Sequence, residues 1–469
     1  MALENTHYGV AKIAEMLVGC KSIFFVGIGG INMSSLSHVT HERGYRVGGS
    51  DRVRTPLVER LASEGIEIFN GHAASNVDGY DAVVYTVAVG GDNPEYLEAR
   101  RRGIPCISRS DYLGYLMTEY RVRVGIAGTH GKSTCTSMCA EILLRAGVDP
   151  TVLSGAELPL MGGAYHIGRN DLFVFEACEY MDSFLDFNPT VAVVLNVELD
   201  HVDYFKSFEQ MKASFGCFMA RTGEDGVAVL NADDADTLAA ASDFAGEKLT
   251  FGVDNEQARV RATAIRLENG RYAFDVTLDG EPLCEAALSV TGYHNVYNAL
   301  AAAAVCARYG ITGEQIASGL AAFGGAHRRM EYKGTCNGAV LYDDYAHHPT
   351  EIAATLRGAR KLTAGRLFCV FQSHTYSRTH ALMDAFAEAL SLADRVLVTD
   401  IYAARETDTK GVTPEGFAKR IGEGAQAVSS FADAAAHLRD ELRAGDVAIV
   451  MGAGDVYKVF DFLGESDGM

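Results

Sequence analysis

A glycine-rich loop set between an apolar run and a helical pattern constrains this chain more than any other segment. Gly128-Thr-His-Gly-Lys-Ser-Thr134 follows the apolar run 122–127, and Met138, Ile142 and Leu143 then recur at helical spacing. In such a strand–loop–helix unit, loop N–H groups and the helix N-terminus bind phosphate, the lysine reaches terminal phosphates, and the next hydroxyl ligates Mg²⁺. Ile126 replaces the first glycine of the strict motif, so a tight turn with a surface lysine is the alternative. The residues expected to bind nucleotide phosphates are Gly128, Thr129, His130, Gly131, Lys132, Ser133 and Thr134.

The same strand-to-glycine-loop pattern occurs in three separate places, at 23–30, 124–131 and 448–455. Short β-rich runs alternate with alanine-rich helical segments between them, which predicts parallel sheets covered by helices. A chain of 469 residues, at roughly 150 per domain, suggests about three domains. We therefore predict an α/β protein with a Rossmann-like N-terminal domain (1–118), a central P-loop ATPase-like domain with a parallel sheet (119–325) and a Rossmann-like C-terminal domain (326–469). The predicted strands are 47–50, 65–69, 82–87, 122–127, 173–177, 191–197, 366–371, 395–400 and 446–451, with a hairpin over 271–290.

The charge balance excludes some kinds of partner. Lys and Arg number 41 and Asp and Glu 61, so the formal net charge is −20, which disfavours nucleic acid and anionic membranes. No apolar stretch reaches the roughly 18 residues that cross a bilayer, and the N-terminus lacks the pattern of a signal peptide. The ten cysteines include no C-x-x-C pair and are typical of reduced core thiols. We expect a cytoplasmic protein, with neither nucleic acid nor a membrane as partner.

Polar side chains that follow different strands predict a metal site. Glu176 ends the run 173–175, and the strand 191–197 leads into His201. Ligands gather at the carboxyl edge of a parallel sheet, so Ser133, Glu176 and His201 are expected to meet there. The carboxylate and hydroxyl oxygens, with those of phosphate, suit Mg²⁺, and a histidine can join at a second cation. A lone histidine is more often structural or solvent-facing than a ligand, so His201 has that alternative, and Asp200 and Asp203 have the alternative of solvated acids.

The N-terminal glycine loop has more than one interpretation. Gly27-x-Gly29-Gly30 follows a strand and Asp51 comes about twenty residues later, which mimics a dinucleotide fingerprint, although Asn32 replaces its third glycine. The same geometry serves any pyrophosphate, so a UDP-sugar, NAD and a purely structural turn all remain open. The expected substrate-binding residues here are Gly29, Gly30, Ser50 and Asp51.

Together these segments resemble the Mur ligases, the ATP-dependent amide-forming enzymes of peptidoglycan precursor synthesis. The resemblance covers nearly the whole chain, with the motifs in order. The matching motifs are Gly128–Thr134, Glu176–Glu179, Asp200-His201, His294-Asn295 with Asn298, His327–Arg329, Asp343–Pro349 and Met451–Asp455.

The resemblance implies a reaction and a division of labour. The first domain would bind the UDP sugar, the central one ATP, and the last would bind the amino acid and close over both, with hinges near Glu119 and Phe323. Gly27–Met33 and Asp343–Pro349 imply that L-alanine is joined to the carboxylate of UDP-N-acetylmuramate through an acyl phosphate, giving ADP and phosphate. A ligase that joins a whole tripeptide to the same sugar nucleotide during recycling is the alternative. A P-loop kinase or NTPase and a non-enzymatic nucleotide-binding regulator are further ones.

Individual roles also follow from the resemblance. Lys132 would contact the ATP phosphates and Arg329 the γ-phosphate, while Arg328 is expected to be a surface charge. Ser133, Glu176 and His201 would surround the metals. The remaining expected contacts are Asn295 and Asn298 to adenine, Asp344 within the nucleotide site, and Tyr345, His347 and Arg378 at the amino acid.

Some roles stay open. Either His201 or His347 could accept the proton of the amine. Other members have a carboxylated lysine near the metals, and its place here is Phe215, so Lys212 is expected on a solvated helix face. The segment 372–380 keeps one arginine, Arg378, whereas some members have further arginines at the positions of Thr375 and His380. This leaves the groups that bind the L-alanine carboxylate undecided. A monomer or a homodimer is expected.

Overall fold

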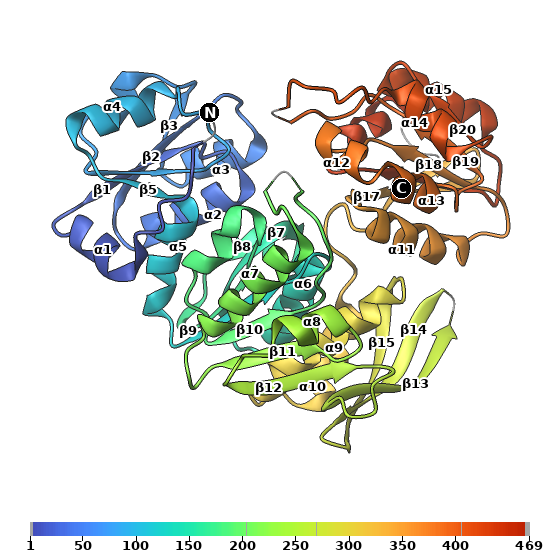
Figure 1. The fold of residues 1–469 in the computed structure, drawn as a ribbon, viewed down its shortest axis with the longest axis horizontal. Coiled ribbons are helices and arrows are strands. Elements are labelled where there is room, and N and C mark those ends of the chain that lie inside the picture. The colour runs from blue at the N-terminus through green and yellow to red at the C-terminus, as the bar shows by residue number, and fades with distance from the viewer. Residues whose placement is uncertain (1–2, 203, 269, 405, 465–469) are drawn as a thin grey trace.

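The computed structural model describes residues 3–464 except 203, 269 and 405, and it divides into three lobes in chain order (Figure 1). Each lobe contains one sheet with helices packed on it, which confirms the predicted α/β class in three domains. None of the described helices has both the length and the apolar character needed to cross a membrane.

The first lobe is a five-stranded parallel sheet in the order β3-β2-β1-β4-β5. The order reverses at β1, so the loops that follow β1 and β4 lie beside a switch point, where ligands of such sheets bind. Its strands are β1 (Ser22–Val26), β2 (Arg46–Asp51), β3 (Glu67–Asn70), β4 (Ala82–Tyr85) and β5 (Cys106–Ser108). Its helices are α1 (Gly9–Met16), α2 (Ile31–Glu42), α3 (Pro56–Ser63), α4 (Pro94–Arg102) and α5 (Arg109–Leu116).

The central lobe contains a ten-stranded sheet in the order β15-β14-β13-β12-β11-β10-β6-β9-β7-β8. Its middle is parallel, and β13, β14 and β15 extend it as an antiparallel meander that includes the predicted hairpin. Its strands are β6 (Val122–Ala127), β7 (Pro150–Leu158), β8 (Gly163–His166), β9 (Arg169–Glu176), β10 (Val191–Val194), β11 (Val227–Asn231), β12 (Glu247–Gly252), β13 (Val260–Glu268), β14 (Arg271–Leu278) and β15 (Glu281–Thr291). Its helices are α6 (Lys132–Arg145), α7 (Phe208–Ala220), α8 (Ala235–Ala240), α9 (His294–Arg308) and α10 (Gly313–Ala322).

The third lobe contains a six-stranded sheet in the order β16-β17-β21-β18-β19-β20, parallel apart from β16. Its strands are β16 (Glu331–Cys336), β17 (Ala339–Asp344), β18 (Leu367–Phe371), β19 (Arg395–Val398), β20 (Ala425–Ala427) and β21 (Val447–Met451). Its helices are α11 (Pro349–Arg360), α12 (Tyr376–Ala381), α13 (Met383–Leu390), α14 (Pro414–Ile421) and α15 (Phe431–Glu441).

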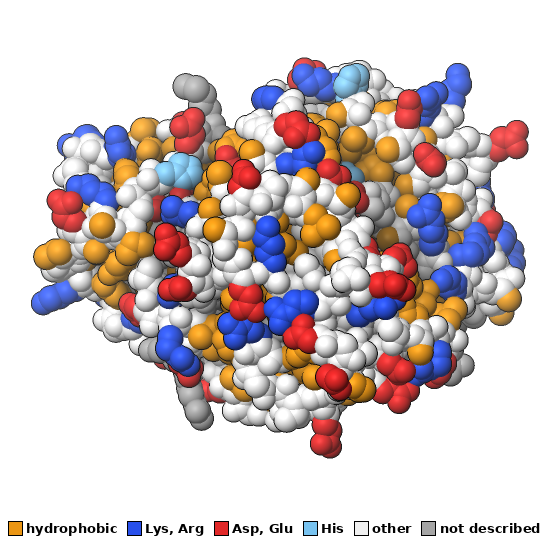
Figure 2. Space-filling model, turned by 60° about the horizontal axis from the view of Figure 1, so that its bottom comes forward, with side chains coloured by type: hydrophobic (Ala, Val, Ile, Leu, Met, Phe, Trp, Pro, Cys, Tyr) orange, Lys and Arg blue, Asp and Glu red, His pale blue; other side chains and the backbone are white. Residues whose placement is uncertain are grey.

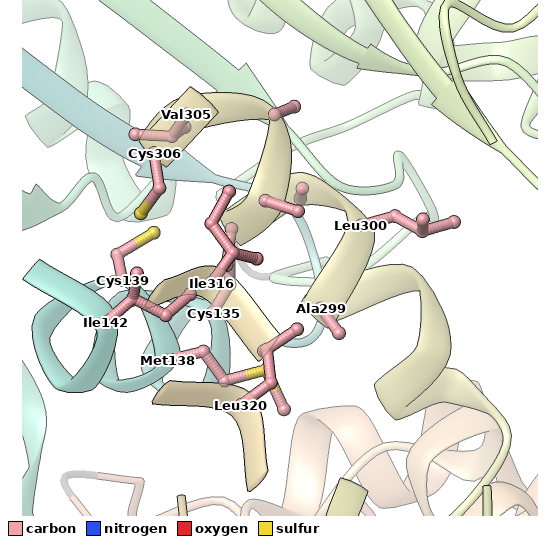
Figure 3. Close-up of a cluster of buried hydrophobic side chains, with 14 of the residues drawn as sticks. Cys135, Met138, Cys139, Ile142, Ala299, Leu300, Val305, Cys306, Ile316 and Leu320 are labelled. Atoms are coloured by element: carbon pink, nitrogen blue, oxygen red, sulfur yellow. The ribbon is translucent and has the colours of Figure 1, made fainter. Parts of the chain in front are cut away.

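Small side chains let the helices of the central lobe approach closely. Residues 299–304 of α9 are fully buried and all but one are alanine. Figure 3 shows α6, α9 and α10 meeting there, with Cys139 and Cys306 pointing toward each other. Five of the ten cysteines are buried, as expected of core thiols, but Cys217 on α7 is exposed, contrary to that expectation.

Several predicted strands end earlier than their apolar runs. The run 191–197 is a strand only to Val194, and 82–87 only to Tyr85. Leu195 instead packs against the phosphate loop, where its Cβ would lie 3.0 Å from a Cβ at Gly128. The apolar residues after these strands are therefore used to build loops at the carboxyl edge.

The joints between the lobes differ in chemistry. One apolar cluster spans the first and central lobes, including Phe25 and Tyr112 of the first and Phe175 of the central lobe. At this joint the rings of Tyr120 and Phe173 stack, with centroids 4.8 Å apart. The two apolar clusters of the third lobe consist of buried residues from 339–459 alone.

Polar contacts link the third lobe to the central lobe. Arg378 pairs with Asp200, the Thr350 hydroxyl donates to Glu198, and the Lys361 ammonium donates to the Tyr272 hydroxyl. Acidic and basic side chains are also interspersed over the face of the molecule in Figure 2.

Candidate active site

The phosphate loop joins the end of β6 to the start of α6. Gly128 and Gly131 have φ of 144° and 86°, a region that other residues adopt at a cost. A Cβ at Gly131 would lie 2.5 Å from Asn298 Oδ1, so the loop also needs glycine there because the neighbouring helix approaches closely. The segment after β10 fixes the loop, since the His130 N–H donates to Asn196 Oδ1 at 2.8 Å.

Lys132 lies folded over this loop. Its ammonium donates to Gly128 O at 2.6 Å and to Thr129 O at 3.1 Å, and it lies 3.1 Å from a Glu179 carboxylate oxygen. Burial lowers the pKa of Lys132, but the charge and hydrogen bond of Glu179, together with Cys178 and Glu176, outweigh burial and leave the pKa raised. The lysine is therefore a charged, mostly buried group, and the alternative of a surface lysine is wrong.

Ser133, Glu176 and His201 lie at the same sheet edge. The Ser133 hydroxyl donates to one Glu176 oxygen at 3.1 Å, and the Ser154 hydroxyl donates to the other at 3.2 Å. His201 Nε2 lies 3.4 Å from Glu179 Oε1, so Glu179 bridges the histidine and the phosphate-loop lysine. Hydroxyl and carboxylate oxygens are the donors that Mg²⁺ prefers, so the residues present fit such an ion.

Glu179 is a site residue that the sequence reasoning did not assign. It is fully buried, and burial raises its pKa, but Lys132 and His201 hold the pKa below the usual value. The signal available was the second glutamate of Glu176-Ala-Cys-Glu179, which the chain places three residues after the first.

A cavity of about 820 Å³ lies between the central and third lobes. The end of the phosphate loop and the start of α9 form one wall, and β17 and α11 form the opposite wall. The predicted nucleotide-site residues that line it are His130, Gly131, Thr134, Asn295, Asn298, Arg329 and Asp344. α9 begins at His294, and in its first turn the Asn298 amide donates to Asn295 Oδ1 at 2.9 Å.

The two adjacent arginines are arranged differently from the expectation. Arg328 is buried, and its guanidinium donates to Asp343 at 3.3 Å and to the carbonyl oxygens of Gly452 at 2.6 Å and Gly454 at 3.1 Å. The prediction of a surface charge at Arg328 is wrong, because the side chain is buried and its partners all belong to the third lobe; its backbone has φ of 56°. Arg329 lines the cavity, with its guanidinium 5.2 Å from the centre of the Tyr345 ring.

Arg378 of the third lobe forms an ion pair with Asp200 of the central lobe. Its guanidinium contacts both oxygens of Asp200, at 2.9 and 3.3 Å, and both side chains are buried. Burial raises the pKa of Asp200, but the nearby charges of His201 and Arg378 more than offset this and hold it well below the usual value. The alternative of a solvated acid at Asp200 is therefore wrong, and Asp203 lies outside the described residues.

His347 lies beside this pair. Its Nδ1 is 3.1 Å from the carbonyl oxygen of Tyr345 and 3.4 Å from Glu351 Oε2. Burial lowers the pKa of His347 to about 3, so its imidazole is neutral near pH 7.

The glycine loop of the first lobe follows β1. Gly27 has φ of 82°, and the Gly29 N–H donates to Asp51 Oδ2 at 2.9 Å. Gly30 caps α2, which begins at the next residue. Ser50 is fully buried, and its hydroxyl donates to Glu95 Oε2 at 2.7 Å, so the structure directs it into the lobe.

Helix α7 contains the two positions discussed for a carboxylated lysine. Phe215 is fully buried, with its ring 5.3 Å from that of Phe184. Lys212 forms ion pairs with Glu209 at 2.7 Å and Asp236 at 3.4 Å.

Comparison with known proteins identifies relatives over almost the entire chain. The Mur ligase family catalytic domain matches residues 22–121, the Mur ligase middle domain 126–306, and the Mur ligase glutamate ligase domain 328–454. A UDP-N-acetylmuramate–L-alanine ligase of Acetivibrio thermocellus is 44% identical over 94% of both chains. One from Clostridium novyi is 42% identical over 95% of this chain and 98% of its own.

Solved structures agree. The UDP-N-acetylmuramate–alanine ligase of Thermotoga maritima has a TM-score of 0.79 at 28% identity, covering 94% of this chain and 98% of its own. A murein peptide ligase of Psychrobacter arcticus has a TM-score of 0.75 at 25% identity, covering 96% and 100%. With all three of its lobes matched, the chain belongs to the Mur ligase family.

Proposed function

We propose that this ligase joins L-alanine to the lactyl carboxylate of UDP-N-acetylmuramate at the expense of ATP, giving ADP and phosphate. The observation that carries the proposal is the identity of 44% and 42%, over nearly full length, to proteins named for this reaction. The charged loop and the interlobe cavity supply the site that such a reaction needs. We place the reaction in the cytoplasm, in a monomer or homodimer whose domains are 1–118, 119–325 and 326–469.

The reaction needs ATP because a carboxylate is a poor electrophile. Its oxygen attacks the γ-phosphorus, the bond to ADP breaks, and an acyl phosphate forms. The amine nitrogen of L-alanine then attacks the carbonyl carbon, phosphate leaves, and the nitrogen loses a proton. The protein mainly positions the reactants and neutralises charge.

Two cations of the chain suit the phosphate groups. Lys132 is held charged at the phosphate loop by Glu179, and Arg329 faces the cavity from the opposite lobe. We assign Lys132 to the ATP phosphates and Arg329 to the γ-phosphate. Gly128–Thr134 then provide N–H donors, and Asn295, Asn298 and Asp344 line the part of the cavity suited to the nucleoside.

Ser133 and Glu176 would hold the Mg²⁺ that accompanies ATP, and His201 would join at a second cation. The ion supplies positive charge beside the transferred phosphoryl group. Glu179 is then a positioning residue, because its carboxylate contacts both Lys132 and His201.

The amino acid site is proposed at Tyr345, His347 and Arg378, and the UDP-sugar site at Gly29, Gly30, Ser50 and Asp51. Between the two candidate bases, the pKa of about 3 makes His347 a weak proton acceptor. We therefore assign His347 to orienting the substrate.

The test measures ADP release with Mg²⁺, ATP and UDP-N-acetylmuramate while the acceptor is changed. L-alanine, glycine, L-serine and L-Ala-γ-D-Glu-diaminopimelate are compared, with Lys132→Ala as the background control. Release that requires both the sugar nucleotide and L-alanine supports the proposal. Release with the tripeptide alone would make the protein a recycling ligase, and release that ignores every acceptor would exclude a ligase.

A further inference from the structure

Three metal-binding side chains from two lobes meet at one end of the interlobe cavity. His130 belongs to the phosphate loop, Glu198 follows β10, and His348 immediately precedes α11. His130 Nε2 lies 3.1 Å from Glu198 Oε2, and His348 Nδ1 lies 4.0 Å from the same oxygen. One donor atom from each of the three residues lies within 4.8 Å of the others. None of the three belongs to the Mg²⁺ site proposed above.

The outer contacts of the cluster match those of protein metal sites. His130 Nδ1 lies 3.2 Å from Glu351 Oε1, the arrangement in which a carboxylate orients a ligating imidazole. The Thr350 hydroxyl donates to Glu198 Oε2 at 2.6 Å and fixes that carboxylate. His348 Nδ1 accepts from the Thr350 N–H at 3.4 Å, and within the described part of the chain its buried Nε2 has no hydrogen-bond partner, so this imidazole has a free nitrogen as well.

The donor chemistry points to a transition metal. Two imidazoles and one carboxylate form a set that binds Zn²⁺, whereas Mg²⁺ takes oxygen ligands. Tetrahedral Zn²⁺ with bonds of about 2.0–2.2 Å separates its ligand atoms by about 3.4 Å. The separations of 3.1 and 4.0 Å from Glu198 Oε2 lie on either side of that value, and His348 Nδ1 would exchange the hydrogen bond that it accepts from the Thr350 N–H, 3.4 Å long, for the ion.

We propose that His130, Glu198 and His348 form a binding site for Zn²⁺ or a similar transition-metal ion, which cross-links the central lobe to the third lobe. The ion would connect the phosphate loop to the start of α11 and fix the two lobes in the arrangement of this structure. Turnover requires nucleotide to enter and leave between these lobes, so bound Zn²⁺ would inhibit. The inhibition rests on the proposed function, whereas Zn²⁺ binding by these three side chains does not depend on which substrates the enzyme uses.

The direct test is calorimetric titration of the full chain with Zn²⁺ in excess Mg²⁺, without nucleotide. His348→Asn removes the imidazole but keeps a good N-cap for α11, and Glu198→Gln removes one charge while it retains an acceptor. Thr350→Val removes only the outer contact of Glu198. His166→Ala is the matched control, because His166 pairs with Asp149 at 2.7 Å, away from the cluster. Thermal unfolding of each variant establishes that it is folded.

We expect one Zn²⁺ bound by the wild type. Thr350→Val should weaken binding by about 10- to 100-fold, the usual loss for an outer-shell partner, and His348→Asn by more than about 100-fold. His166→Ala should bind as the wild type does. Binding that survives both His348→Asn and Glu198→Gln, or that is lost in Glu176→Gln instead, would overturn the proposal. Absence of binding to the folded wild type would also overturn it and leave an ion-pair cluster centred on His130.

Discussion

Replacing Arg328 with methionine separates the tasks of two adjacent arginines. The Arg328 guanidinium is buried and is shared by Asp343 and the carbonyl oxygens of Gly452 and Gly454. Methionine keeps much of the apolar stem but donates nothing, so one carboxylate and two carbonyl groups lose their buried donor. Removing one partner of a buried ion pair costs about 3–5 kcal/mol. Burial already raises the pKa of Asp343, so its carboxyl can take up a proton in the variant, and we place the loss near about 3 kcal/mol.

The assay is thermal unfolding, followed by ADP formation, for Arg328→Met and Arg329→Met side by side. A loss of about 3 kcal/mol lowers Tm by about 6–12 °C for a lobe of this size. Arg329 lines the cavity, so Arg329→Met should change stability by less than about 0.5 kcal/mol. Its ADP formation should nevertheless fall by about 10²–10³. Equal Tm values for the two variants, or a lower Tm for Arg329→Met alone, would refute the assignment of Arg328 to the fold and Arg329 to the nucleotide.

Three further substitutions test the site. Lys132→Ala should still fold, with a lower Tm because buried Glu179 loses its cation, and should lower ADP formation by about 10²–10³, since one charge-stabilising donor is lost; near-normal turnover in the folded variant would contradict the phosphate-loop assignment. Glu176→Gln should shift the Mg²⁺ titration of activity to higher concentration, and an unchanged titration would remove this residue from the metal site. Burial raises the pKa of Asp344 from 3.8 to about 6, so ionisation costs the folded state stability as pH rises through 6. Asp344→Asn removes about 3 kcal/mol of this cost and loses about 1 kcal/mol of hydrogen bonding. The urea midpoint of the variant should therefore exceed that of the wild type by more at pH 8 than at pH 4. A difference in midpoint that does not change with pH would contradict the raised pKa.

Local patterns predicted the parts of the site that lie within one short segment. The strand, the glycine loop and the helix around Lys132 follow one another directly in the sequence, so their order could be predicted from one contiguous motif. The position of Glu176 at the end of β9 followed in the same way from an apolar run that stops at a carboxylate.

Contacts between lobes could not be predicted in this way. Asp200 and Arg378 are 178 residues apart, and Glu198 and Thr350 are 152 apart, so their pairing depends on how separate lobes dock. Arg328 has a left-handed backbone with φ of 56°, although it is not a glycine, and no residue type typical of turns stands at this position from which that conformation could be predicted. Ser50 similarly satisfies a buried carboxylate whose position depends on α4.

The chemistry of the two joints determines which lobe is free to swing. Separating the first lobe from the central one would expose the packed rings of Phe25, Tyr120 and Phe173 to water, and the hydrophobic effect opposes this. Pulling the third lobe away breaks ion pairs and hydrogen bonds, such as those of Asp200 and Glu198, whose groups water can solvate in turn. We therefore expect substrate exchange to proceed mainly by motion of the third lobe about the hinge near Phe323, with the first and central lobes moving together.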